Sequence, residues 1–454
     1  MKFGGTSVGS AEAIRRVVSI VDAQLKRRPV VVVSAIGQTT QQLLNMAAEA
    51  ARGRKNHAFL QFEETRAVHE KVVQGAIAGA DQKLACRMVD AHFRELENIL
   101  EELAILGEPS SRMLDMIASF GERLSSELVT LAFRNSAIES VGVDARGIIV
   151  TDARHTRAMP LYSQTYSRLR ESVLPLVQKD RVVVLGGFIG STEDGITTTL
   201  GRGGSDFTAA IVGAGIDADE IQIWTDVDGV MTCDPKMVPE ARRVKKISFA
   251  EAAELAYFGA KVLHPATLLP AIEKNIPIRV LNSRRPDLPG TRIEAESVPC
   301  RNVIKAISCK RHVSLINIRS TRMLMAHGFL HRIFEVFDRA ETSVDMLASS
   351  EVSVSLTIDD SSRMREICEE LQQFSEVKVD GDQAIVCVVG DNIRYTPGVA
   401  ARVFSALGDI NVRMISQGAS LLNLSFVVST GDVQKAVVKL HKEFFSDPDP
   451  AVFN

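Results

Sequence analysis

Short apolar runs alternate with helix-like patterns along residues 1–283. The β-branched run at 30–35 predicts a buried strand, and runs of the same kind occur at 182–185, 221–224 and 278–281. Strands that are apolar along their whole length are typical of a parallel sheet covered by helices on both faces. The fold class of this region is therefore predicted to be α/β, an α/β/α sandwich with a mainly parallel central sheet.

Two helices of this region have recognisable ends. The first is predicted to begin after Ser10, because the apolar residues that follow recur on one helical face: Ile14, Val17, Val18, Val21 and Leu25. The second has an S-x-x-E capping box at Ser248 and Glu251, which predicts where it begins. Gly259 suits its C-terminal cap, and Pro265 prevents its further extension.

An internal repeat follows a change of composition. Residues 284–302 are rich in Arg, Pro and Gly, which predicts a linker. Beyond it, a Gly-x-x-x-Arg-(Ile/Val)-Phe pattern begins at Gly328 and again at Gly398. Each copy lies in a β-α-β-β-α-β pattern, so two ferredoxin-like domains are expected at 303–380 and 381–454. The C-terminal segment is a candidate to complete the first of them.

The composition is that of a folded protein without a strong electrostatic bias. The chain has 454 residues, of which 45% are hydrophobic and 24% charged, and a net charge of -3. We therefore expect no nucleic-acid partner and no membrane partner. The six cysteines are scattered without a C-x-x-C pair, so neither a disulfide framework nor a structural metal site is predicted. A cytoplasmic location is expected, or a plastid-like one if a transit peptide has been removed.

Two glycine-rich loops carry candidate phosphate chemistry. The sequence Lys-Phe-Gly-Gly-Thr-Ser stands at 2–7, and Gly-Arg-Gly-Gly-Ser-Asp stands at 201–206. Glycines let backbone N–H groups approach an anion, a helix N-terminus attracts negative charge, and Lys or Arg neutralises phosphate oxygens. A single Gly-Gly is more often a tight turn, but two such loops with cations favour polyanion binding. Neither is a Walker A or a Rossmann motif.

Together with their neighbours, these loops form an ordered series of motifs. The series is K-F-G-G-T-S at 2–7, S-A-I-G-Q-T-T at 34–40, F-G-E-R at 120–123, G-G-F-I-G at 186–190, T-T-T-L-G-R-G-G-S-D at 197–206, W-T-D-V-D-G-V at 224–230 and F-G-A-K-V-L-H-P at 258–265. The chain thereby resembles the amino-acid kinase family, and within it the aspartate kinases of the lysine-sensitive type. The resemblance covers essentially the whole chain, and the C-terminal repeat resembles their paired ACT domains.

The resemblance implies the transfer of a phosphoryl group from ATP to L-aspartate, giving ADP and 4-phospho-L-aspartate. This is the first step toward lysine, threonine and methionine. Lys2 and Asp206 are the implied catalytic residues: Lys2 stabilises the phosphoryl charge, and Asp206 orients Lys2. Mg²⁺ is implied with ATP as the cofactor pair, held mainly by the phosphates and water.

The resemblance also implies the binding residues. For aspartate they are Ser34, Thr40, Glu122, Phe188, Arg202, Gly203 and Ser205, with Glu122 taking the amine and Arg202 the α-carboxylate. Without the motif around it, Glu122 would be read as a solvated helix charge. For ATP they are Lys2, Phe3, Gly4, Gly5, Thr225, Asp226, Met231, Lys236, Lys261 and Val262. Met231 stands where the family often has an aromatic residue.

An amino-acid effector, expected to be lysine, is implied in the repeat. Its implied contacts are Met323, Gly328, Phe329, Leu330, Ser343, Val344, Asp345, Ser349, Ser350 and Glu351. Met325 and Ala326 replace a His-Ser pair common in lysine-sensitive members. The alternative is a surface turn with charges that bind nothing specific. Residues 414–420 of the second repeat are expected to pair between subunits, giving a homodimer or a dimer of dimers through the ACT domains.

Two alternative functions and one structural question stay open from the sequence. The protein could be a related kinase acting on glutamate or N-acetylglutamate, or a non-catalytic ACT regulatory subunit. Family members usually have several residues before K-F-G-G-T-S, whereas only Met1 precedes Lys2 here. Either the first strand is short, or the native start lies upstream.

Overall fold

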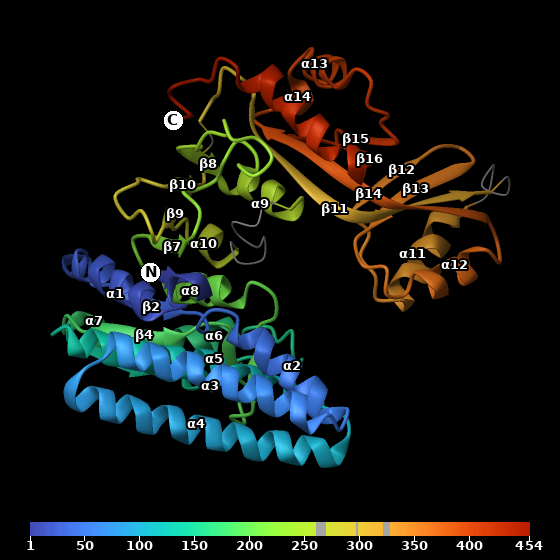
Figure 1. Ribbon diagram of the computed structural model, residues 1–454. Coiled ribbons are helices and arrows are strands. Elements are labelled where there is room, and N and C mark those ends of the chain that lie inside the picture. The colour runs from blue at the N-terminus through green and yellow to red at the C-terminus, as the bar shows by residue number, and fades with distance from the viewer. Residues whose placement is uncertain (260–268, 297, 321–326) are drawn as a thin grey trace. The chain divides into compact units, whose positions relative to one another are not determined.

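The computed structural model describes residues 1–259, 269–296, 298–320 and 327–454, which divide into two units (Figure 1). The first unit comprises Met1–Val230 and Val262–Ala295, and the second comprises Met231–Lys261 and Glu296–Asn454. Three predicted site residues lie outside the described residues: Lys261, Val262 and Met323. The predicted helix stop at Pro265 and the substituted pair at Met325 and Ala326 also lie outside them.

The first unit contains the predicted, mainly parallel sheet. Its strands are β1 (Lys2–Phe3), β2 (Val30–Val33), β3 (Ser140–Val143), β4 (Val182–Gly186), β7 (Ile221–Thr225), β9 (Ile278–Asn282) and β10 (Thr291–Glu294). They follow the order β3-β4-β2-β1-β7-β9-β10. All neighbours are parallel except β9 and β10, which are antiparallel. The four apolar runs are therefore confirmed as strands, and the segment predicted as a linker contains β10.

Helices cover this sheet. They are α1 (Ala11–Asp22), α2 (Thr39–Ala51), α3 (Lys55–Ala76), α4 (Gly79–Leu106), α5 (Ser111–Asn135), α6 (Tyr162–Arg168), α7 (Leu174–Gln178), α8 (Gly204–Gly215) and α10 (Leu269–Glu273). Figure 1 shows α5 between β4 and the outer helix α4, and α5 contacts both. A small antiparallel pair, β5 (Ile189–Ser191) and β6 (Thr197–Thr199), lies apart from the main sheet.

The predicted N-cap of α1 is confirmed, but the extent of the helix was overestimated. Ser10 Oγ accepts a hydrogen bond from Ala13 N at 3.1 Å. The helix ends at Asp22, and Leu25 begins a separate 3₁₀ turn in which it is exposed. An apolar residue in phase with a helical face therefore does not always extend the helix, because a turn can follow.

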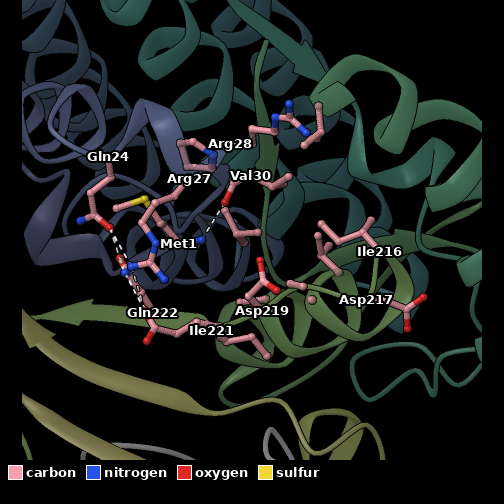
Figure 2. A pocket seen from close by; sticks show the side chains of 18 of the residues that line it. Met1, Gln24, Arg27, Arg28, Val30, Ile216, Asp217, Asp219, Ile221 and Gln222 are labelled. Atoms are coloured by element: carbon pink, nitrogen blue, oxygen red, sulfur yellow. Dashed lines mark hydrogen bonds and ion pairs between the residues drawn. The ribbon is translucent and has the colours of Figure 1, made fainter. Parts of the chain in front are cut away.

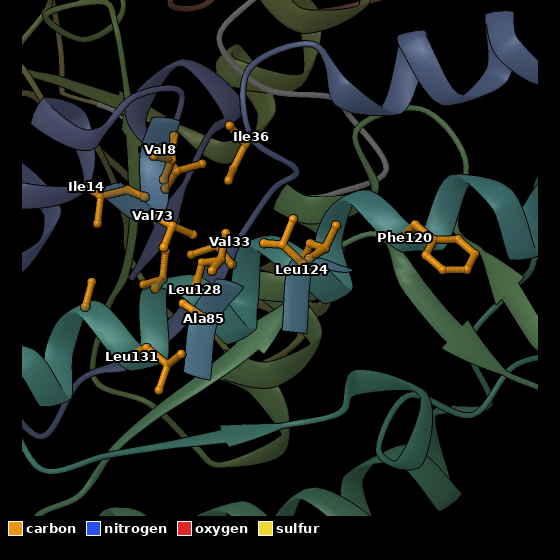
Figure 3. Close-up of a cluster of buried hydrophobic side chains, with 14 of the residues drawn as sticks. Val8, Ile14, Val33, Ile36, Val73, Ala85, Phe120, Leu124, Leu128 and Leu131 are labelled. Carbon is orange, nitrogen blue, oxygen red and sulfur yellow. The ribbon is translucent and has the colours of Figure 1, made fainter. Parts of the chain in front are cut away.

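The core of the first unit fixes the strand and the helix that carry the candidate site. Figure 3 shows part of this cluster, in which Val33 of β2 lies near Leu124 and Leu128 of α5. Phe3 is fully buried and stacks on Trp224 with 5.9 Å between ring centroids. Although β1 has two residues, it pairs with β2 on one side and β7 on the other. Lys2 is therefore held between two strands.

The second unit contains a six-stranded sheet in the order β12-β13-β11-β14-β16-β15. Its strands are β11 (Ile304–Arg319), β12 (Met346–Ser349), β13 (Ser353–Ile358), β14 (Glu376–Gly390), β15 (Met414–Gln417) and β16 (Asn423–Ser429). Its helices are α9 (Phe249–Tyr257), α11 (Phe329–Arg339), α12 (Met364–Leu371), α13 (Val399–Leu407) and α14 (Val433–Phe445), and β8 (Lys246–Ser248) precedes α9. All pairs in this sheet are antiparallel, as expected for ferredoxin-like domains.

The sequence motifs predicted in this unit coincide with the starts of its helices. Ser248 and Glu251 form the predicted capping box at the start of α9. The repeated glycines, Gly328 and Gly398, are the N-caps of α11 and α13 with φ of 81° and 82°. This left-handed conformation favours glycine, which explains why the repeat keeps it. The predicted boundary at 380 falls within β14, which is hydrogen-bonded to β11 along most of its length.

Candidate active site

Four loops meet at the carboxyl edge of the parallel sheet. They follow β1, β2, β4 and β7, which are neighbours in the sheet, and such an edge is where α/β folds bind ligands. Backbone hydrogen bonds join the loops: Gly4 N donates to Trp224 O at 3.2 Å, and Gly37 N donates to Gly5 O at 3.0 Å. Gly187 N donates to Val33 O at 2.8 Å. The predicted motifs at 2–7, 34–40, 186–190 and 224–230 therefore lie together.

Lys2 and Asp206 form an ion pair at this edge. Lys2 Nζ lies 2.7 Å from Asp206 Oδ1, and the two side chains are only 10% and 17% exposed. Asp206 lies in the first turn of α8, whose N-cap is Gly203. A Cβ built on Gly4 would lie 3.5 Å from Lys2 Nζ, so the ammonium is next to the Gly-Gly turn. An ammonium, a glycine turn and a helix N-terminus are the components of a phosphate site.

Two glycines of this edge are required by close packing. A Cβ on Gly5 would lie 2.6 Å from Gly37 O, and a Cβ on Gly187 would lie 2.7 Å from the Cα of Ser205. Neither backbone atom could move without displacing a neighbouring loop. The close approach of Gly187 to Ser205 places the strand end of β4 against the first turn of α8.

Glu122 is a buried carboxylate with one open oxygen. Its residue is 3% exposed, and Oε1 accepts a hydrogen bond from Ala35 N at 3.2 Å. Among the described residues, no group donates a well-formed hydrogen bond to Oε2. Burial raises the pKa of Glu122 to about 8, against the lowering effects of the Ala35 amide, Lys2 and the Thr40 hydroxyl. A buried carboxylate of this kind is stabilised by an incoming cation, because the cation restores the interactions lost with water.

Other predicted aspartate residues lie on the loops after β2 and β4 and at the start of α8. Ser34 N donates to Phe3 O at 3.1 Å, directly after β2. Phe188 has a φ of 65°, and its N–H donates to Thr208 Oγ1 at 2.9 Å. Arg202 is exposed and makes no ion pair within the described parts of the chain. Its guanidinium is therefore available to a ligand.

The predicted nucleotide residues divide between the two units. Thr225 and Asp226 follow β7 in the first unit, and Thr225 Oγ1 donates to Asp226 Oδ1 at 3.3 Å. Met231 and Lys236 belong to the second unit. The backbone of Met231 forms an isolated antiparallel β-bridge with that of Arg243, and Lys236 is exposed. Their roles stay predictions.

Sequence reasoning missed polar residues that tie the loops together. Ser7 Oγ lies 2.8 Å from Ser283 Oγ, and Ser283 N donates to Thr225 O at 2.8 Å. The loop after β1 is thereby joined to those after β7 and β9. Asp115 of α5 was missed as well, although it is buried and accepts several hydrogen bonds. A lone serine or aspartate has no pattern in the sequence that marks such a role.

A separate cavity of about 370 Å³ lies at the opposite edge of the sheet (Figure 2). Its described lining includes Met1, Val30 and Ile221, which stand at the amino ends of β1, β2 and β7. Gln222 Nε2 donates to Gln24 Oε1 at 2.9 Å beside it. None of the predicted catalytic, ATP or aspartate residues lines it, so this cavity is not part of the candidate active site.

In the second unit, the predicted effector residue Asp345 already has a cationic partner. Lys310 Nζ of β11 lies 2.7 Å from Asp345 Oδ1 and 2.6 Å from Asp359 Oδ2. Phe329 is buried at the start of α11, and Leu330 beside it is exposed. Ser343 and Val344 precede Asp345, and three other predicted residues are exposed at the β12–β13 turn: Ser349, Ser350 and Glu351.

Comparisons with known proteins place the chain in a family. Residues 1–282 match the amino acid kinase family, and residues 386–444 match an ACT domain. Lysine-sensitive aspartokinase 3 of Escherichia coli is 36% identical over 459 residues, covering 98% of both chains. Chloroplastic aspartokinase 1 of Arabidopsis thaliana is 36% identical over 477 residues, covering 99% of this chain and 80% of that one.

Solved structures give the same result. Escherichia coli aspartokinase III in complex with aspartate and ADP has a TM-score of 0.88 and 34% identity, covering 98% of this chain and 99% of that one. The same protein in complex with lysine and aspartate has a TM-score of 0.82, at the same identity and coverage. The chain belongs to the amino acid kinase family, and within it to the aspartokinases.

No helix in the described ranges is long and apolar enough to cross a membrane.

Proposed function

We propose that the protein is an aspartate kinase that converts ATP and L-aspartate to ADP and 4-phospho-L-aspartate. The observation that carries the proposal is the arrangement at one sheet edge of the Lys2–Asp206 ion pair, the Gly4-Gly5 turn and the buried carboxylate of Glu122. The first two suit a phosphoryl group, and the third suits the ammonium of an amino acid. The near-full-length aspartokinase relatives support the same substrates.

The reaction needs positioning and charge neutralisation more than proton transfer. The β-carboxylate oxygen of aspartate forms a bond to the γ-phosphorus as the bond to the bridging oxygen of ADP breaks. A carboxylate is ionised at neutral pH, so no general base is required. Lys2 would stabilise the charge on the transferred group, and Asp206 would hold the ammonium in place through their 2.7 Å contact.

Aspartate recognition would rest on two groups of opposite charge. Glu122 would accept the substrate ammonium at its open Oε2, and Arg202 would bind the α-carboxylate. Together they would direct the β-carboxylate toward the Lys2 side of the site. Mg²⁺ would accompany ATP and be held mainly by its phosphates and water.

The test is ADP release by the purified protein with aspartate, glutamate or N-acetylglutamate as acceptor. Turnover with aspartate is expected, whereas turnover with glutamate but not aspartate would contradict the proposal. Lys2→Ala should lower kcat by roughly 10²–10³-fold or more, as removal of a charge-stabilising group does in other enzymes. A folded Lys2→Ala protein with unchanged kcat would exclude the catalytic role of Lys2, whereas wild-type protein without turnover on any of the three acceptors would leave the regulatory-subunit alternative.

We further propose feedback regulation through the ACT domains, with lysine as the effector, at the head of the lysine, threonine and methionine pathways. The lysine complex of an aspartokinase relative supports the choice of effector. The proposed site is the turn at 343–345 with residues 349–351 and the start of α11, and the predicted assembly is a homodimer or a dimer of dimers. Separate and paired titrations with lysine, threonine and S-adenosylmethionine, and sedimentation with and without them, test these points.

A further inference from the structure

Asp115 is a buried carboxylate that the proposed mechanism does not use. It lies on α5 seven residues before Glu122, about two helical turns, so the two carboxylates point from the same face of the helix. The Asp115 side chain is 1% exposed. Charged side chains are rarely buried to this extent unless they are fully hydrogen-bonded, so its partners indicate what it holds in place.

Those partners come from the loop at 154–157 and from Thr199, which directly precedes the glycine-rich loop at 201–206. His155 Nδ1 lies 2.7 Å from Asp115 Oδ2, and Thr156 N donates to both carboxylate oxygens at 3.0 Å. Thr199 Oγ1, at the end of β6, donates to Oδ1 at 2.5 Å. Thr156 has a φ of 70°, a conformation that a β-branched residue adopts only when its surroundings impose it. Asp115 supplies that constraint.

The segment that carries Arg202 rests on this arrangement. Thr199 O accepts a hydrogen bond from Ala158 N at 2.9 Å, and Leu200 N donates to Phe188 O at 2.9 Å. Gly201, with a φ of 75°, packs so closely on the loop that an added Cβ would lie 3.2 Å from Thr156 O. Arg202 itself makes no ion pair within the described part of the chain that could hold it. Its position therefore depends on the backbone beneath it.

We propose that Asp115 is a positioning residue for aspartate recognition, because it fixes the 154–157 loop and Thr199 against which the Arg202 segment packs. This proposal rests on the proposed role of Arg202 in binding the α-carboxylate. Two buried carboxylates of helix α5 then contribute to the recognition of one substrate. Glu122 contacts the ammonium directly, and Asp115 acts at a distance through the loop that presents the guanidinium.

The test compares Asp115→Asn and Thr199→Val with Thr130→Val in steady-state kinetics. Thr130 is a matched control because it is a buried threonine of α5 whose hydroxyl bonds to Ser126 O. Asp115→Asn should raise the KM for aspartate by about 10-fold or more, with the KM for ATP unchanged and kcat lowered by less than about 3-fold. Thr199→Val should act in the same direction but less strongly, and Asp115→Glu should not restore the KM, because the longer side chain displaces the carboxylate.

A double-variant cycle separates positioning from general stability. In an Arg202→Ala background, Asp115→Asn should raise the KM for aspartate no further, because the group it positions is gone. Equal changes in both KM values, or additive effects with Arg202→Ala, would overturn the proposal. If Asp115→Asn does not fold, Thr199→Val decides the matter. Wild-type protein without aspartate turnover would instead refute the proposed function.

A second, independent observation concerns the predicted effector site. The Asp345 side chain is 3% exposed and is paired with Lys310, whose ammonium also contacts Asp359 and lies 5.5 Å from the centre of the Tyr257 ring. Asp345 Oδ2 is buried and receives no hydrogen bond from the described residues. One ammonium thus faces two carboxylates, so the cluster keeps a net negative charge and one open oxygen.

We infer that Lys310 occupies the ammonium subsite of the effector, so that an amino-acid effector must compete with it for Asp345. This inference rests on the proposed regulation by an amino acid. A bound effector ammonium would leave Lys310 paired with Asp359 alone. Tyr257, which ends α9, would then lose its present cationic neighbour.

Calorimetric titration of lysine into the full chain, without ATP or aspartate, tests this competition apart from turnover. Lys310→Met should bind lysine at least about 10-fold more tightly than wild type, because the competing charge is removed. Lys378→Met is the control, since Lys378 is an exposed lysine of the same sheet. Equal affinity in Lys310→Met and wild type, or no binding to Lys310→Met, would overturn the inference. Binding only to Lys310→Met would support it.

Discussion

Glu122 has a pKa of about 8 in the ligand-free protein, mainly because burial disfavours its charged form. In its proposed role, Glu122 binds aspartate in the charged form, since only a carboxylate pairs with the substrate ammonium. At neutral pH most molecules therefore lose a proton from Glu122 when aspartate binds. The KM for aspartate should consequently fall as the pH rises toward the pKa of this residue.

The size of the effect follows from the fraction of ionised Glu122. With a pKa of about 8, that fraction is about 1% at pH 6 and about 50% at pH 8. The KM for aspartate should fall by about 50-fold across this interval, and by less than about 2-fold from pH 8 to pH 9. The KM for ATP contains no such contribution.

The raised pKa of Glu122 also affects stability, in the opposite direction: aspartate binding should strengthen as the pH rises, whereas the free energy of unfolding should fall. The folded pKa lies above the ordinary value of 4.5, so the folded chain holds a proton that the unfolded chain releases. Stability from this group is complete below about pH 4.5 and is lost as the pH rises through about 8, by on the order of 4–5 kcal/mol. Glu122→Gln should therefore unfold at higher urea concentration than wild type at pH 9, while binding aspartate more weakly.

The assay is the KM for aspartate in wild type, Glu122→Gln and Glu127→Gln from pH 6 to pH 9. Glu127 is the matched control, because it lies on the same helix and burial raises its pKa too. Glu122→Gln should have a high KM that does not change over this range, whereas Glu127→Gln should keep the wild-type slope. A flat wild-type profile, or a slope that persists in Glu122→Gln, would refute the reasoning.

Three further perturbations probe other parts of the structure. Asp206→Asn should lower kcat by about 10²-fold while leaving the KM for aspartate nearly unchanged, because Lys2 would lose its charged partner; steady-state kinetics measure this. Gly187→Ala should weaken binding of both substrates, since its Cβ would lie 2.7 Å from the Cα of Ser205; isothermal binding of each substrate would detect it. Lys305→Met should destabilise the second unit by about 3–5 kcal/mol in urea unfolding, because Glu251 would stay buried without this ammonium at 2.7 Å. The pair Lys305→Met with Glu251→Gln should recover part of that loss.

The features predicted from the sequence are those with local causes. The four apolar runs became strands because their burial requires no knowledge of distant residues. The cap at Ser10 and the box at Ser248 were equally visible, because each motif lies within four residues. The site loops were recognised through the family resemblance, and their positions at adjacent strand ends followed from the parallel sheet.

Features that depend on distant pairing were not predictable. β14 extends past the boundary drawn from the repeat at 380, since it pairs with β11 of the first repeat as well as with β16 of its own. Asp115 and Lys310 look in the sequence like surface charges on a helix and a strand. Only folding brings Asp115 to Thr199, 84 residues away, and Lys310 to Asp345, 35 residues away.

The short strand β1 shows how two residues suffice to hold the proposed catalytic lysine, Lys2. Lys2 pairs with Val32 on one side and Ile223 on the other, so its backbone position is fixed by two strands that are themselves buried. Phe3 adds a fully buried ring stacked on Trp224, whose removal would cost about 3–5 kcal/mol. The Lys2 side chain is then restrained at its far end by Asp206. Because restraints act at both ends of the side chain, its ammonium is held in place before any substrate binds, as the proposed stabilisation of a phosphoryl group requires.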